Sequence, residues 1–205
     1  ELGIGNIPRR AAGVVAGDFD NDMDVDIYVV TTGLASNPPN ILFENQGDGT
    51  FIAVPDAGGA AGSKLGLGNF AIVADYDGDG FLDLLVANGR GSPDLMIEQG
   101  PYQLFQNESK KNGNRNHWLE IDLQGLRSNR DGIGARVLLT AGGKTQLREQ
   151  SNGAHYSVQD HRRLHFGLGS NTVAQELLIK WPSGIEQRIL NVNADQLLRV
   201  IESDD

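Results

Sequence analysis

Two clusters of aspartates repeat the same spacing in the N-terminal half of the chain. The stretch GDFDNDMDVDIYVV, residues 17–30, places aspartates at alternate positions and continues as an apolar segment. The stretch ADYDGDGFLDLLVAN, residues 74–88, repeats its D-x-D-x-D-x-x-x-D pattern. Asp18 and Asp75, which begin the two patterns, are 57 residues apart. The chain therefore contains an internal repeat built around an acidic loop.

Each cluster concentrates like charges that need compensation, because neighbouring carboxylates resist ionisation beside one another. Side-chain oxygens at loop positions 1, 3, 5 and 9, with a backbone carbonyl at position 7, suit Ca²⁺, which takes about six to eight oxygen ligands. We therefore predict two Ca²⁺ sites. The backbone carbonyls would come from Asp24 and Phe81. The side-chain ligands would be Asp18, Asp20, Asp22 and Asp26 in the first loop and Asp75, Asp77, Asp79 and Asp83 in the second.

The sixth position distinguishes the two loops. Gly80 occupies it in the second loop, where the sharp turn favours a positive φ, whereas Met23 occupies it in the first. We expect the second loop to be the better formed, although the first has one more carboxylate, and we expect the Asp24 side chain to be dispensable. Neither loop is an EF-hand, because Val29 and Val86 stand at position 12, where an EF-hand has Glu. Mg²⁺ prefers fewer protein ligands, and Zn²⁺ prefers nitrogen and sulfur donors.

Strand and turn signals dominate the whole chain. The apolar segments around each cluster have β-strand character, and NILFENQGDGTFIAV at 40–54 predicts a hairpin with a degraded counterpart at 102–114. A Gly/Asn-rich segment at 112–116 indicates a boundary, which divides the chain into parts 1–114 and 115–205. The second part has six strand candidates, at 117–123, 135–141, 144–150, 163–168, 175–181 and 197–202. We predict an all-β protein whose second part is an antiparallel sandwich or barrel, with one weak helix candidate at 193–198.

The charge is local rather than general. The chain has 205 residues and a net charge of −10, and residues 1–110 hold 16 acidic against 5 basic side chains. Nucleic-acid binding is disfavoured, because phosphate attraction requires a basic surface. The sequence contains no apolar run of about 18 residues, so we expect no membrane insertion. It has no cysteine, which excludes disulfides and thiolate metal sites. It begins at Glu1 rather than Met, which suggests processing or a longer parent chain.

The first half resembles the FG-GAP/VCBS repeat family, and the second half resembles the ASPIC/UnbV domain. The FG-GAP/VCBS resemblance rests on the two aspartate loops and on the hairpin residues Asn40, Leu42, Phe43, Asn45, Gly47, Asp48, Gly49, Thr50 and Phe51. The ASPIC/UnbV resemblance rests on NHWLEI (116–121), SNRDGIGARV (128–137), HFGLG (165–169), WPSG (181–184) and NV (191–192).

These resemblances imply calcium-stabilised blades of a β-propeller followed by a small β domain. They imply extracellular or cell-surface life and do not imply an enzyme. A propeller closes with roughly 4–8 blades, whereas this chain supplies two repeats. The chain is therefore expected to belong to a longer protein or to use its open strand edges for self-assembly into an oligomer or filament.

Other constellations are weaker candidates. His155, His161 and His165 could share one strand face, and Ser157, Asp160 and His161 could be read as a hydrolytic trio, but nothing in the sequence fixes their geometry. A carbohydrate-binding accessory role would need exposed rings near Trp118, Tyr156 or Trp181, and core burial is the expectation for both tryptophans. NRDGIGAR at 129–136 is Gly-rich and basic but predicts a β-turn rather than a phosphate loop. Asn107 begins an N-x-S sequon.

Overall fold

The apolar segments that flank the aspartate clusters form β-strands, as their pattern predicts. A computed structural model of the chain describes residues 3–4, 7, 10–33, 37–89, 98–151 and 158–204. The described residues contain fourteen strands in four sheets and one short 3-10 helix, η1 (Pro55–Gly59). The predicted all-β fold class is confirmed. No helix in these ranges is long and apolar enough to cross a membrane.

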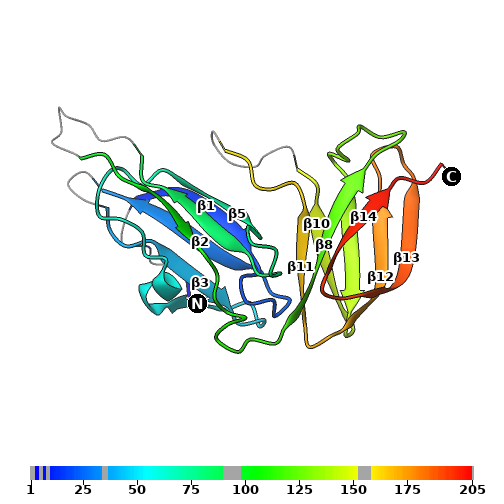
Figure 1. Cartoon of the computed structure of the whole chain (residues 1–205), viewed down its shortest axis with the longest axis horizontal. Coiled ribbons are helices and arrows are strands. Elements are labelled where there is room, and N and C mark those ends of the chain that lie inside the picture. Colours follow the sequence, from blue (N-terminus) through cyan, green and yellow to red (C-terminus); the bar gives the residue numbers. More distant parts are fainter. Residues whose placement is uncertain are drawn as a thin grey trace.

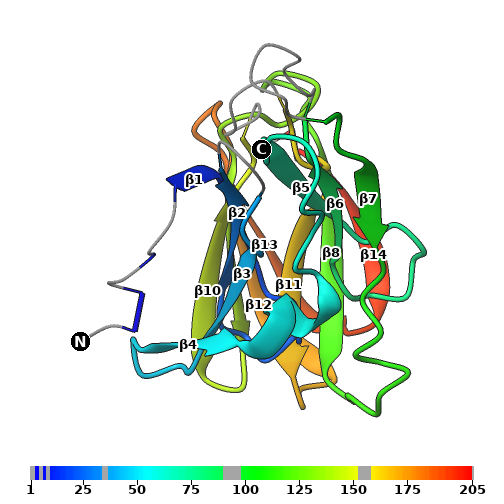
Figure 2. The same ribbon diagram turned by 90° about the vertical axis from the view of Figure 1, so that its left-hand side faces the viewer.

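The two repeats form two antiparallel sheets whose strands follow chain order (Figure 2). The first contains β1 (Arg10–Gly17), β2 (Asp26–Thr32), β3 (Ile41–Asn45) and β4 (Phe51–Val54). The second contains β5 (Phe70–Ala74), β6 (Asp83–Ala87) and β7 (Tyr102–Phe105). Their pairing is equivalent, because Ile27 lies opposite Phe43 in one sheet and Leu84 opposite Phe105 in the other. The predicted hairpin is thus β3–β4, whereas its degraded counterpart forms only β7.

The two repeat sheets share one hydrophobic core. Strands β1 and β5 lie beside each other, and apolar side chains from both sheets form one buried cluster. The cluster includes Val15, Tyr28, Val30, Ala71, Val73, Leu84 and Val86. Burying the valine and leucine side chains of this cluster stabilises the fold by about 1.5–3 kcal/mol each. The repeats therefore pack on each other as adjacent units, with both aspartate loops in the turns that follow β1 and β5.

The C-terminal half is a sandwich of two sheets. One sheet has the order β10-β9-β12-β13 and the other β11-β8-β14. Their strands are β8 (His117–Gln124), β9 (Arg136–Ala141), β10 (Lys144–Glu149), β11 (Leu164–Gly169), β12 (Val173–Lys180), β13 (Glu186–Asn193) and β14 (Gln196–Ile201). Side chains from both sheets form one buried core, which includes Leu119, Phe166, Leu139 and Leu177. Figure 1 shows that β11, β10 and β8 lie on the side of this sandwich that faces the repeat sheets.

The sequence-based predictions for the C-terminal half need three corrections. The described strands close into no barrel, and β14 runs parallel to β8, so the sandwich is not purely antiparallel. The helix candidate at 193–198 is wrong, because that segment contains the end of β13, a two-residue turn at 194–195 and the start of β14. Strand β13 was not predicted. Asn191 has a φ of 56°, and the alternation of buried and exposed residues in β13 changes there, from Gln187 and Ile189 to Val192.

A buried glutamate closes the end of the sandwich. Glu202 is 1% exposed, and its Oε2 accepts hydrogen bonds from the backbone N–H groups of Leu126, Arg127 and Ser128 at 2.7–2.8 Å. Its Oε1 accepts hydrogen bonds from the hydroxyls of Ser128 and Ser183. Burial acts to raise the pKa of Glu202, but these hydrogen bonds outweigh burial and lower the pKa to about 2. The carboxylate therefore organises the loop that precedes the turn at 129–136.

Glu202→Gln is expected to destabilise the protein by about 2 kcal/mol, because the amide turns a donor toward groups that are themselves donors. The folded-state pKa lies below the unfolded value of 4.5, so this stabilisation is present above about pH 4.5 and is lost as the pH falls toward 2. Urea unfolding of both proteins at pH 7 measures the difference. Glu186→Gln is the control, because the exposed Glu186–Lys180 pair contributes less than about 1 kcal/mol. Equal stability of Glu202→Gln and wild type would contradict this role.

Candidate metal centre

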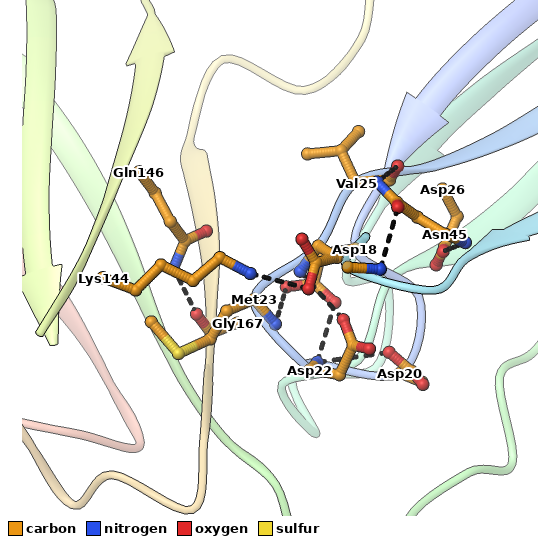
Figure 3. A network of polar contacts seen from close by, with 12 residues as sticks. Asp18, Asp20, Asp22, Met23, Val25, Asp26, Asn45, Lys144, Gln146 and Gly167 are labelled. Carbon is orange, nitrogen blue, oxygen red and sulfur yellow. Dashed lines mark hydrogen bonds and ion pairs between the residues drawn. The ribbon is translucent and has the colours of Figure 1, made fainter. Parts of the chain in front are cut away.

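The two aspartate loops share a set of equivalent hydrogen bonds. In the first loop the Asp18 carboxylate accepts hydrogen bonds from the backbone N–H groups of Asp22 and Met23, both at 3.0 Å. In the second loop Asp75 accepts them from Asp79 at 3.1 Å and from Gly80 at 2.9 Å. The backbone N–H of the fifth loop residue also donates to the side chain of the third. Asp22 donates to Asp20 in the first loop and Asp79 to Asp77 in the second, both at 3.2 Å. The sequence repeat is thus a repeat of loop hydrogen bonding, and Figure 3 shows the first of the two loops.

Each loop gathers three carboxylates around one point. Ligand oxygens of Asp18, Asp20 and Asp22 lie within 4.8 Å of one another, and so do those of a second group. The second group is Asp75, Asp77 and Asp83. Elsewhere in the described ranges, no other three candidate ligand side chains converge in this way. Asp26 and Asp79 were predicted as ligands but do not belong to these groups.

The ninth position of each loop ties the loop to the third strand of its sheet. Asp26 accepts hydrogen bonds from the N–H groups of Phe19 at 3.0 Å and Asn45 at 2.9 Å. Asp83 does the same with Tyr76 at 2.8 Å and Asn107 at 2.7 Å. These carboxylates therefore hold the loop closed whether or not they also contact an ion.

The sequon residue Asn107 has a structural role. Its side-chain amide donates hydrogen bonds to the carbonyls of Phe19 at 2.7 Å and Leu82 at 3.1 Å. Asn45, at the equivalent place in the first repeat, donates to the carbonyl of Val25 at 3.1 Å. The side-chain nitrogen to which a glycan would be attached is thus engaged inside the fold.

The clustered carboxylates resist ionisation. Burial, followed by the charges of Asp20 and Asp22, raises the pKa of Asp18 from 3.8 to about 8. Burial is also the largest cause that raises the pKa of Asp20 to about 6 and of Asp26 to about 7. In the second loop burial raises the pKa of Asp75 and of Asp83. A divalent cation would compensate these charges, and an all-oxygen donor set fits Ca²⁺.

Position 7 differs between the loops. Asp24, predicted to serve through its carbonyl, pairs through its Oδ2 with the Nζ of Lys144 at 2.6 Å. Its backbone N–H donates to Asp22 Oδ1 at 2.8 Å. Phe81 is buried, and its N–H donates to Asp79 Oδ1 at 3.0 Å. The Asp24 side chain therefore links the first loop to the C-terminal half, a role that the sequence did not reveal.

Two residues near the loops were missed by sequence reasoning. The charge of Glu44 is among the causes that raise the pKa of Asp20, after burial and the charge of Asp22. Gln106 donates a hydrogen bond from its Nε2 to Asp77 Oδ2 in the second loop. The signal was available, because both residues immediately precede the equivalent asparagines in LFEN and LFQN.

The alternative sites are not assembled in the described residues. His165 is buried, its Nε2 lies 3.0 Å from the Gly80 carbonyl, and burial lowers its pKa to about 4. Asp160 accepts a hydrogen bond from the backbone N–H of Val73 at 3.1 Å. His155, Tyr156 and Ser157 lie outside the described residues. Trp181 is 3% exposed and donates its indole N–H to Gln187, so it offers no stacking surface.

Comparisons with known proteins agree with the two halves of the fold. Residues 18–86 match the family model of the FG-GAP-like repeat, and residues 125–205 match the family model described as ASPIC and UnbV. The recognition made from the sequence is therefore confirmed, because the two matched regions lie in the parts of the chain where the FG-GAP/VCBS and ASPIC/UnbV resemblances were seen.

Curated relatives share both halves. The chain is 28% identical over 205 residues to cartilage acidic protein 1 of Mus musculus. This match covers 97% of the chain and 30% of the mouse protein. The chain is 29% identical over 202 residues to the Homo sapiens protein of the same name. This match covers 96% of the chain and 28% of the human protein. The chain thus spans less than a third of the length of these relatives.

In the metal-free protein, acidification from pH 8 to pH 5 is expected to raise the melting temperature. The folded-state pKa of Asp18, about 8, lies above the unfolded value of 3.8, so its contribution to stability is present below pH 3.8 and is lost as the pH rises through 8. Thermal unfolding in EDTA across this range measures the slope.

Asp18→Asn should reduce that slope without abolishing it, because Asp20 and Asp26 also have raised pKa values, whereas Asp56→Asn, at an exposed position outside the clusters, should leave it unchanged. If the melting temperature of the metal-free protein is higher at pH 8 than at pH 5, this would contradict the expected cost of ionising the loop.

Proposed function

We propose that this chain is a calcium-stabilised extracellular structural or adhesion module. The observation that carries the proposal is the presence of two equivalent loops, each with three carboxylates whose ligand atoms lie within 4.8 Å of one another. The FG-GAP-like and ASPIC/UnbV matches support a module of this class, and the relatives that match both halves are named cartilage acidic protein 1. We propose a binding role rather than catalysis.

The role of the ion would be to neutralise the buried carboxylates. Asp18, Asp20 and Asp22 would hold one Ca²⁺, and Asp75, Asp77 and Asp83 the other. Bound calcium supplies positive charge that removes the repulsion within each loop. Each loop connects the first two strands of its sheet. A loop held in one conformation by the ion would therefore set the spacing of the blades. Extracellular sites of this kind bind with Kd of about 10⁻⁴–10⁻³ M.

We further propose that the chain associates with a second copy along β7. In the first repeat β3 is paired on its outer side by β4, with Leu42 opposite Val54. The equivalent strand β7 ends its sheet and carries two exposed apolar side chains, Tyr102 at 72% and Leu104 at 49%. An exposed edge of this kind is a template for strand pairing. Within the residues that the structure describes, no observation favours the carbohydrate-binding alternative.

Chelation of calcium is expected to lower the melting temperature. At calcium ten times Kd each site would contribute about 1.4 kcal/mol, which corresponds to a fall of roughly 3–6 °C per site. Differential scanning calorimetry with calcium and with EDTA measures the response. Asp77→Ala should remove the contribution of the second loop, whereas Asp204→Ala, outside both clusters, should keep the full response. An unchanged melting temperature in EDTA would refute calcium stabilisation.

Leu104→Lys is expected to weaken self-association at least roughly tenfold, because a charge on an edge strand opposes pairing. Sedimentation equilibrium across a range of concentrations gives the dissociation constant. Leu190→Lys is the matched control, since Leu190 is also an exposed leucine on an edge strand, β13. A monomer at all concentrations, or equal weakening by both variants, would argue against β7 as the interface.

A further inference from the structure

The first aspartate loop inserts a side chain into the core of the C-terminal sandwich. Met23 is 9% exposed and belongs to the buried cluster formed by the two sandwich sheets. Its φ of 83° matches that of Gly80, 93°, at the same place in the second loop. Asn171 donates its side-chain amide to the Met23 sulfur at 3.6 Å. The residue that stands in place of glycine in this loop is therefore an anchor between the two halves of the chain.

The backbone of the same loop continues the contact along β11. The N–H of Gly169 donates to the carbonyl of Asn21 at 2.7 Å. Gly167 lies so close that an added Cβ would stand 2.1 Å from Asp18 Oδ2 and 2.5 Å from the Cα of Asn21. Glycine is required at position 167 because the backbone of Asn21 leaves no space for a Cβ atom. Asp18, a member of the carboxylate group, thus lies directly against the C-terminal half (Figure 3).

The second loop contacts the same sandwich through Gly80. An added Cβ on Gly80 would lie 1.8 Å from the indole Nε1 of Trp118 on β8. The carbonyl of Gly80 accepts hydrogen bonds from Asn21 Nδ2 and from His165 Nε2, each at 3.0 Å. One carbonyl of the second loop therefore joins the first loop and β11.

Polar contacts complete the contact between the halves. Lys144, in β10, forms the ion pair with Asp24. Asn114 and Asn116, just before β8, donate their side-chain amides to the carbonyl of Asp20 at 2.7 and 3.0 Å. Consecutive residues of the first loop thus contact the C-terminal sandwich or the segment that leads into it.

We propose that the two loops form a calcium-dependent latch that holds the ASPIC/UnbV sandwich in one orientation against the repeat sheets. This inference rests on the proposed calcium binding. The backbone that would wrap the ion is the backbone that docks on β11, so loosening the loop moves Met23 and Asn21 out of register with the sandwich. Binding and docking are then reciprocally coupled, because each favours the same loop conformation.

The absence of cysteine from the sequence allows spin labels to be placed in pairs on the full chain. Ile52→Cys with Leu190→Cys joins the two halves at exposed positions. Pulsed electron–electron double resonance should give a narrow distance distribution with calcium and a broad one with EDTA. Two control pairs, Ile52→Cys with Tyr102→Cys and Leu147→Cys with Leu190→Cys, lie within one half each and should keep their distributions.

Gly167→Ala tests the contact without changing a loop residue. It should broaden the distribution between the halves even with calcium and weaken calcium binding, measured by calorimetry, by a factor between about 5 and 150. Gly143→Ala is the matched control. It introduces the same methyl group in the same domain at a φ of 80°, with nothing within 4 Å, and therefore strains the domain without touching the loop.

The outcomes separate this inference from the proposal on which it rests. Calcium binding by calorimetry with an unchanged distribution between the halves would overturn the latch and leave calcium binding intact. Equal broadening of the distance distribution for the pair Ile52→Cys with Tyr102→Cys would also overturn the latch, because calcium would then only hold the blades together. A wild-type distribution in Gly167→Ala would overturn the role of the first loop. No calcium binding at all would overturn both.

Discussion

The structure depends on a conflict between burial and charge in the first aspartate loop. Three carboxylates, those of Asp18, Asp20 and Asp22, occupy one small region, and burial raises the pKa of each. Backbone N–H groups satisfy part of their hydrogen-bonding capacity, since Met23 and Asp22 donate to Asp18. Hydrogen bonds of this kind favour the charged form, yet burial and mutual repulsion outweigh them. Under the proposed function, a bound cation would compensate these charges.

The two loops share a conformation but differ in their surroundings. Met23 and Gly80 both adopt a positive φ, which the turn imposes on any residue at that position. The strain of a side chain there is of order 1 kcal/mol. In the first loop that strain is offset because the Met23 side chain is buried in the sandwich core. In the second loop Trp118 lies where a side chain would be, so only glycine fits.

Local features were predictable from the sequence, whereas contacts between distant segments were not. The spacing of Asp18, Asp20 and Asp22 predicts a loop because its hydrogen bonds join residues two to five positions apart. The pairing of Asp24 with Lys144 joins residues 120 positions apart, and no local pattern signals it. Strand β13 was missed for a different reason: Asn191 breaks the alternation from which strands are recognised. The parallel pairing of β14 with β8 likewise depends on the path of the whole chain.

The missing fourth strand of the second sheet and the docking of the C-terminal half have one origin. The first three strands of both repeats pair in the same order, and the amides of Asn45 and Asn107 then bond to equivalent carbonyls. After Asn45 the chain reverses and forms β4, but after Asn107 it leaves the sheet toward β8. On that path Asn114 and Asn116 meet the carbonyl of Asp20 in the first loop. The segment that could have completed the second sheet instead joins both loops to the sandwich, so an open edge at β7 is the structural consequence of coupling the two halves.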